Sequence, residues 1–323
     1  MRKTRLAAFL VLAFFAALLS GTEAAFAAYP EKPIEWVIWA SPGGGSDIFV
    51  RNMARLMEPY VSQPFVPVNK SGGGGAVGMA YTASKPADGH TILAVTTNFV
   101  LTPALGRSPK GPADFDMIAR VAVETNVVAV STDAPYKTWE EFVAYAKQKG
   151  GVSWGTFGVG TSDHVASAKL SKLSGIKSRF VPFEGGADSL ASLMGGHIDV
   201  LTNNPSELTE QIAAGQVRLL GSFSAERWDA FPEVPTFKEL GYDVVVPTWR
   251  GVVAPKGTPK EALDYLAAAL EKVVAQEGFQ KYLADNQLEA AYLNSTDFAL
   301  FVAEQDLFYK RELKELGLIK EKK

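Results

Sequence analysis

The chain of 323 residues carries 32 basic and 35 acidic side chains, three His and no Cys, with a formal net charge of −3. This length exceeds what one hydrophobic core organises comfortably, and it predicts two lobes. The mild negative charge, without a basic run longer than a pair, argues against nucleic acid as a partner. Without Cys or a His pair at ligand spacing we expect no metal, and no pattern indicates another cofactor.

The first 27 residues have the order of a secretory signal peptide. Three basic residues precede an apolar run over residues 6–19, and Ala25-Phe26-Ala27 offers small residues at a cleavage site. A retained membrane anchor is the weaker alternative, because a spanning helix needs roughly 20 apolar residues. We expect cleavage after Ala27 and a soluble periplasmic chain. That chain would hold 29 basic and 34 acidic residues, a net charge of −5.

Nine apolar, β-rich runs follow along the chain and predict strands. They cover residues 34–39, 65–68, 91–96, 127–131, 152–156, 179–183, 198–202, 217–223 and 244–254. Helically spaced segments lie between most of them. In residues 48–60, for example, Phe49 and Met53 share one face while Arg51 and Arg55 share the other. This alternation predicts an α/β fold in which mostly parallel sheets are flanked by helices.

Helix starts are marked by capping residues. Thr138 with Glu141 and Thr236 with Glu239 have the spacing of capping boxes, and Pro259 fits a first helical turn. We find no internal repeat and no low-complexity linker. Any boundary between lobes is therefore expected to be crossed by ordered chain, as in a hinge.

Glycine-rich loops follow four of the predicted strands, and each precedes a helix. They cover residues 42–47, 71–75, 158–164 and 184–188. Such loops bring the free N–H groups and the positive dipole end of a helix to the edge of a sheet, where they can hold a carboxylate. The alternative is ordinary tight turns with capping residues. Four loops split between the two halves favour a shared anion-binding cleft.

Two enzymatic interpretations are alternatives to an anion-binding cleft. Residues 73–78 satisfy the dinucleotide pattern G-x-G-x-x-G, but Asn98 lies near the position where an acid is expected. A serine hydrolase could use Ser46 or Ser162 with His164. However, residues 44–48 lack the last glycine of a nucleophile elbow. Ser162 and His164 are also two residues apart on one helical turn, which separates their side chains. We expect no enzyme, with a periplasmic serine hydrolase as the alternative.

Arg250 lies in the last long apolar run, beside Trp249. A guanidinium buried there would need an anionic partner. The alternative is an edge strand with Arg250 in solvent.

The chain resembles the receptors of tripartite tricarboxylate transporters, also called Bug receptors. The resemblance runs over nearly the whole predicted mature chain. Its motifs lie at residues 29–34, 42–47, 68–75, 87–93, 160–164, 181–186, 193–199, 232–236 and 254–259. It implies a two-lobed periplasmic binding protein of type II-like fold. The first lobe would combine residues 28–127 with residues 249–323, and the second would cover residues 128–248.

The resemblance also implies which residues contact the ligand. The first lobe would supply Gly44, Gly45, Ser46, Asp47, Thr97 and Asn98. The second would supply Thr161, Ser162, His164, Phe183, Gly185, Asn203 and Asn204, and we add Arg250 from the argument above.

The implied ligand is a small organic acid, a di- or tricarboxylate or an aromatic carboxylate. The implied partners are integral membrane permease subunits, and we expect a monomer. A receptor that signals to a sensor kinase without transport is a further alternative. Many relatives have a proline at Trp39, an aromatic residue at Ala40 and often an acid near Asn203. The neutral Asn203 and Asn204 favour purely anionic or polar ligands here.

Overall fold

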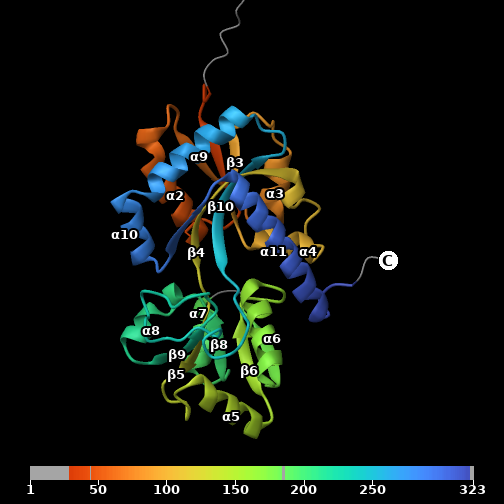
Figure 1. Cartoon of the computed structure of the whole chain (residues 1–323), viewed down its shortest axis with the longest axis vertical. Helices are drawn as coiled ribbons and strands as arrows, with labels where there is room; N and C mark the ends of the chain where they lie inside the picture. The colour runs from red at the N-terminus through yellow and green to blue at the C-terminus, as the bar shows by residue number, and fades with distance from the viewer. Residues whose placement is uncertain (1–28, 44, 184–185, 321–323) are drawn as a thin grey trace, which may run out of the picture.

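The computed structural model describes residues 29–43, 45–183 and 186–320, and the chain forms two lobes stacked along its long axis (Figure 1). The first lobe combines segments from both ends of the described chain, and the second is formed by its middle. The predicted signal peptide, Gly44 and Gly185 lie outside the described residues.

The first lobe contains a six-stranded sheet in the order β11-β4-β10-β3-β1-β2. Its strands are β1 (Ile34–Ile38), β2 (Phe65–Asn69), β3 (Thr91–Thr96), β4 (Phe115–Glu124), β10 (Thr248–Pro255) and β11 (Glu289–Leu293). Strand β1 pairs in parallel with β2 and β3. Strand β10 pairs antiparallel with both β3 and β4, and β11 is antiparallel to β4.

The second lobe contains a five-stranded sheet in the order β7-β6-β8-β5-β9. Its strands are β5 (Val127–Ser131), β6 (Val152–Thr156), β7 (Ser178–Pro182), β8 (Val200–Asn203) and β9 (Val217–Ser222). Strand β6 is parallel to β7 and β8, whereas β5 is antiparallel to β8 and β9.

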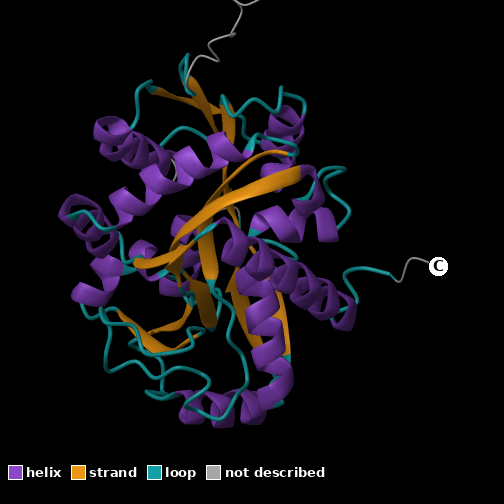
Figure 2. Cartoon of the chain, turned by 45° about the horizontal axis from the view of Figure 1, so that its top comes forward, coloured by secondary structure: helices purple, strands orange, loops and turns teal. Residues whose placement is uncertain are grey.

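Helices cover both faces of the sheets (Figure 2). The first lobe has α2 (Gly45–Met57), α3 (Ala76–Ala83), α4 (Asn98–Ala104), α9 (Lys260–Val274), α10 (Glu277–Asp285) and α11 (Ser295–Glu315). The second has α5 (Trp139–Lys149), α6 (Ser162–Ser174), α7 (Gly186–Met194) and α8 (Thr209–Ala213). Short 3-10 turns lie at η1 (Glu58–Tyr60), η2 (Gly73–Gly75), η3 (Pro112–Asp114) and η4 (Pro205–Glu207).

The alternation of side chains along β1 explains why its sequence is apolar except at Glu35, which accepts the Tyr81 hydroxyl at 2.7 Å. Trp36 and Ile38 join the core under α2 and α9, while Val37 joins the core on the opposite face of the sheet. Successive strand residues point to opposite faces, so a strand covered on both sides has apolar residues on both of its faces. The same packing holds the carboxyl end of β1 in place.

Helix α11 connects the two lobes. It packs along β4 and α4 in the first lobe and reaches α6 in the second (Figure 1). Tyr309, on this helix, is fully buried. Beyond it, Glu312 accepts an ion-pair contact of 3.3 Å from Lys169 on α6, and Glu315 one of 3.1 Å from Lys172. The lobes are therefore joined by packed side chains as well as by the crossing chain.

The chain passes between the sheets twice. It leaves the first sheet after Glu124 and enters the second at Val127, and it returns between Ser222 and Thr248. The predicted boundaries after residues 127 and 248 stay predictions at the level of single residues.

The predicted two-lobed α/β fold is confirmed. The sheets, however, are mixed, and the expectation that they are mostly parallel was wrong. Strand β4 was missed because Asp116 and Arg120 interrupt its apolar pattern. Both have local partners: Arg120 Nε donates to the carbonyl of Ala291 at 2.9 Å, and Asp116 accepts the N–H of Gly257 at 2.7 Å.

Candidate functional site

A cleft of about 800 Å³ lies between the lobes, where the carboxyl ends of β1, β3, β6, β7 and β8 converge. Open α/β sheets commonly bind ligands at this edge, because loops and helix N-termini gather there. The structure brings nine of the predicted residues to the cleft wall: Gly45, Ser46, Thr97, Asn98, Thr161, Ser162, Phe183, Asn204 and Arg250. That these residues contact a ligand stays a prediction.

The loop before α2 is organised by Asp47. This side chain is only 6% exposed and lies behind the wall instead of lining the cleft. Its Oδ2 accepts the N–H of Gly43 at 2.9 Å, and its Oδ1 accepts from Arg51 Nε and Asn69 Nδ2, each at 2.9 Å. The Arg51 hydrogen bond lowers the pKa of Asp47 to about 2, and the Gly43 and Asn69 bonds add to the effect. Asp47 therefore holds the loop as an acceptor that is ionised at neutral pH, and Ser46 lines the cleft.

The loop before α6 is organised by Asp163 and His164. Asp163 Oδ2 accepts the N–H of Phe157 at 2.6 Å, and burial raises its pKa to about 6. His164 Nδ1 accepts the N–H of Gly160 at 2.9 Å, and the ring packs edge-on against Phe180. Burial lowers the pKa of His164, which agrees with a neutral, accepting ring nitrogen. His164 thus shapes the loop from behind the wall.

The two hydroxyls at the start of α6 do line the cleft. Thr161 Oγ1 donates to the carbonyl of Gly158 at 3.0 Å, and Ser162 Oγ lies 3.5 Å from Thr248 Oγ1. Thr248 belongs to the segment that returns to the first lobe, so the Ser162 contact connects α6 with β10. His164 is engaged by the Gly160 N–H, and the structure forms no Ser162–His164 hydrogen bond.

The loop after β8 contributes Asn204 and Glu207 to the wall. Asn203 is fully buried, and its Oδ1 accepts the N–H of Asn204 at 2.7 Å. Asn203 therefore orients the turn and does not line the cleft. Burial raises the pKa of Glu207, and the nearby carboxylates of Glu124 and Asp163 raise it further. The sequence argument, which considered only the neutral amides, missed this acid.

Arg250 has its anionic partner within the protein. Its Nη2 lies 3.1 and 3.3 Å from the two carboxylate oxygens of Glu124, and both side chains are largely buried. The guanidinium also lies over the ring of Phe49, 5.2 Å from its centroid. Because β10 pairs with strands on both sides, the edge-strand alternative was wrong. The expected anion is Glu124, a residue that the sequence argument did not identify.

The model of the tripartite tricarboxylate transporter family receptor matches residues 49–318. The chain belongs to this family. A Cupriavidus necator relative, described as the UPF0065 protein in the gbd 5' region, is 32% identical over 294 residues, 90% of each chain.

Solved structures agree with this assignment. A TctC solute binding protein from Polaromonas is 33% identical, with a TM-score of 0.79 over 89% of this chain and 99% of that one. An R. palustris protein solved with adipate is 25% identical, with a TM-score of 0.77 over 90% of this chain and 98% of that one.

Further residues of the receptor line the cleft without having been predicted as contacts. They are Trp39, Ala40, Gly74, Thr96, Arg107, Glu124, Asn126, Phe157, Gly158, Val159, Asp163, Pro182, Glu207 and Thr248. Gly158 and Asp163 belong to a glycine loop that the sequence singled out, so the loop signal could have included them. Arg107 and Glu207 follow no motif, and only the folded chain brings them to the cleft.

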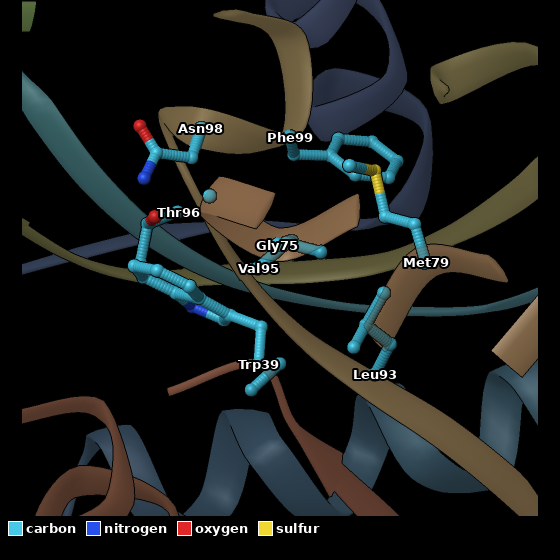
Figure 3. Close-up of a pocket in the computed structure, with 10 residues that line it drawn as sticks. Trp39, Gly75, Met79, Leu93, Val95, Thr96, Asn98 and Phe99 are labelled. Atoms are coloured by element: carbon cyan, nitrogen blue, oxygen red, sulfur yellow. The ribbon is translucent and has the colours of Figure 1, made fainter. Parts of the chain in front are cut away.

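A small apolar pocket of about 10 Å³ shares lining residues with the cleft of the receptor, and Figure 3 shows the side chains around it. Met79, Leu93 and Phe99 surround it, and Trp39 and Asn98 belong to both the pocket and the cleft. This volume has room for about one water-sized group. It therefore places a short apolar surface beside the polar helix ends.

In the part of the chain that the structure describes, no three His, Asp or Glu side chains gather as a metal site requires. No helix within the described ranges is both long and apolar enough to cross a bilayer.

Proposed function

We propose that this receptor captures a small carboxylate between its lobes in the periplasm and delivers it to the integral membrane permease of a tripartite transporter. The observation that carries the proposal is the convergence of helix N-terminal residues from both lobes on one cleft. Ser46 comes from α2, Ser162 is the first residue of α6, and Thr161 directly precedes it. Free N–H groups and the positive dipole end of each helix favour an anion there. The adipate-bound relative supports a carboxylate ligand.

The proposed contacts are the nine predicted residues on the cleft wall. Of these, Asn98 and Asn204 add amide groups from opposite lobes, and Phe183 adds an apolar surface. A ligand that touches both lobes favours the state in which they are closest, because it binds that state more tightly. The two crossing segments would act as the hinge for this closure.

The geometry supports a receptor over a hydrolase. A serine nucleophile needs a base within hydrogen-bonding reach, but the neighbour of Ser162 is a Thr248 hydroxyl and His164 accepts a backbone N–H. We therefore propose a protein that binds its ligand without turnover and acts as a monomer.

Calorimetric titration with a panel of mono-, di- and tricarboxylates tests the proposal. Ser46→Ala and Thr161→Ala should each weaken binding by roughly ten- to a hundredfold, as expected for the loss of one hydrogen bond to a charged group. If both hydroxyls hold the same carboxylate, the double variant should deviate from additivity. The helix-capping Thr138 lies outside the cleft, so Thr138→Ala is the matched control and should leave affinity unchanged.

Two results would contradict the proposal. One is the absence of binding by any carboxylate in the panel. The other is turnover of ester or amide substrates by the wild-type protein that Ser162→Ala abolishes, because this would establish the hydrolase alternative.

A further inference from the structure

Among the described residues two arginines line the cleft, and their charges are used differently. Arg250 is committed to Glu124, whose carboxylate lies within 3.3 Å of the guanidinium. This close pair leaves little net charge for a ligand. Arg107 is the second arginine, and no carboxylate of the described residues forms an ion pair with it. Among the described residues of the cleft wall, Arg107 is therefore the cation that is available to a ligand.

The backbone around Arg107 is well anchored, while its side chain is exposed. Arg107 follows α4, and its N–H donates to the carbonyl of Thr102 at 3.0 Å. Leu105, two residues earlier, donates its N–H to Leu101 at 2.9 Å. A fixed backbone with a free guanidinium is suited to ligand recognition, because only the side chain has to be ordered on binding.

Leu105 also places this segment against the second lobe. A Cβ atom on Gly160 would lie 2.9 Å from both methyl groups of Leu105. Gly160 belongs to the loop that precedes α6, whose Thr161 and Ser162 line the cleft. Arg107 therefore projects from the first lobe at a point where the lobes already touch, near the proposed carboxylate contacts.

The remaining charged residues on the described part of the cleft wall are acidic. Glu207 has no ion-pair partner among the described residues, and Asp163 accepts a backbone N–H. A second anionic group on the ligand would be repelled by these acids, and Arg107 is the one unpaired cation on the described wall that can receive it. A guanidinium holds a carboxylate through two parallel hydrogen bonds, which gives both affinity and orientation.

We propose that Arg107 receives the second anionic group of the ligand, so that the receptor selects acids with two carboxylates over monocarboxylates of the same length. This inference rests on the proposed function, since the first carboxylate is held at the helix N-termini. It names Arg107 as the residue that sets specificity at the other end of the ligand.

Matched pairs of acids test the inference by calorimetric titration. The probes are succinate, glutarate and adipate, each compared with butanoate, pentanoate or hexanoate of the same chain length. In the wild-type protein at least one diacid should bind more tightly than its monoacid. Arg107→Gln should weaken that diacid by roughly ten- to a hundredfold. The monoacids should change by less than about twofold, because they do not reach the guanidinium.

Two further variants separate charge from geometry. Arg107→Lys keeps the charge but loses the bidentate fork, so it should retain part of the preference for diacids. Arg55→Gln is the control for net charge, since Arg55 bonds Asn52 on the exposed face of α2 and does not line the cleft. It should leave the affinities for both kinds of acid unchanged.

The outcomes distinguish the inference from the proposed function. If Arg107→Gln bound diacids as tightly as the wild type, the inference would be wrong while the proposed function stood. The alternative is that Glu207 binds the distal group of the ligand. 6-Aminohexanoate tests this alternative, because it carries an ammonium group where adipate carries its second carboxylate. A wild-type preference for 6-aminohexanoate over adipate, lost in Glu207→Gln, would overturn the role of Arg107. If no acid of either kind bound the wild type, the proposed function itself would fail.

Discussion

The loops before α2 and α6 face the same cleft from opposite lobes and have similar sequences. Each combines glycines, a hydroxyl residue at the start of the helix and an aspartate directly after it. Asp47 accepts a backbone N–H in the first lobe, and Asp163 does so in the second. The surroundings of the two acids differ, however. Asp47 has Arg51 as a cationic partner, whereas burial is the dominant influence on Asp163.

The second difference is contact between the lobes. Gly43 has open space where a Cβ would point, while Gly160 lies against Leu105 of the other lobe. The loop before α2 is therefore held only within its own lobe at these positions, through Asp47 and Asn69, whereas the loop before α6 also lies against the opposite lobe. Loop sequence alone does not determine how a loop responds to mutation, pH or closure.

Substituting the two glycines should produce the largest difference in stability between the two loops. Gly43 and Gly160 have nearly equal positive φ values of 80° and 83°, where an L side chain costs about 1–2 kcal/mol. Gly43→Ala should lose about 1 kcal/mol of unfolding free energy for this reason alone. Gly160→Ala also forces a methyl group against Leu105, and overpacking adds about 1–3 kcal/mol. Urea denaturation should therefore show the larger loss for Gly160→Ala.

A double variant isolates the contact between the lobes. In a Leu105→Ala background, Gly160→Ala should no longer overpack the contact. Its loss of unfolding free energy relative to Leu105→Ala alone should then resemble the loss caused by Gly43→Ala in the wild type. Equal losses for Gly43→Ala and Gly160→Ala in the wild-type background would show that Leu105 does not constrain the loop.

The two aspartates should respond to neutralisation in opposite directions near pH 7.5. Asp47→Asn weakens charge-assisted hydrogen bonds with Gly43, Arg51 and Asn69, and should cost about 2 kcal/mol, a modest sum because Arg51 is half exposed. Asp163→Asn keeps an oxygen that can accept the Phe157 N–H and removes the cost of burying a charge. It should be neutral or slightly stabilising at this pH.

The two aspartates should also change the stability of the fold in opposite ways as the pH changes. The folded-state pKa of Asp47, about 2, is lower than the ordinary value of 3.8, so its stabilisation is present above pH 4 and lost as the pH falls toward 2. The folded-state pKa of Asp163, about 6, is raised, so the ionised form destabilises the fold. Relative to Asp163→Asn, the wild type should lose about 2 kcal/mol as the pH rises from 4 to 7. A parallel pH dependence of the two proteins would contradict this environment for Asp163.

Much of this architecture followed from local patterns in the sequence. The strands β1, β3, β5 and β6 were predicted to within a residue because each is a short apolar run followed by a glycine or hydroxyl signal. The sheet order and the antiparallel β10 were not predicted, since strand pairing depends on contacts between segments far apart in the chain. Of the strands missed, β4 carries two charged residues whose partners lie more than 130 positions away.

The residues of the site also fall into those that a local sequence pattern predicted and those that it did not. Ser46, Thr161 and Ser162 were found because a glycine loop before a helix is a local signal. Asp47 and His164 were assigned to the ligand by the family resemblance, although the structure engages both with loop backbone. Arg107 was missed, because an exposed arginine in a loop has no local pattern that indicates a cleft. Sequence identified where the helices start but could not tell which side chains at those starts face outward.

The smallest difference between the loops concerns their hydroxyls in the ligand-free protein. Thr161 Oγ1 donates to the carbonyl of Gly158 at 3.0 Å, whereas no hydrogen bond of the Ser46 hydroxyl is found among the described residues. Thr161→Val keeps the shape of the side chain and removes this bond, which should cost about 0.5–1.5 kcal/mol. Ser46→Ala should change the unfolding free energy by less than about 0.5 kcal/mol. Urea denaturation of both variants without ligand measures the two costs. If Ser46→Ala were the more destabilising, its hydroxyl would cap α2, and a loss of affinity in that variant would no longer identify a ligand contact.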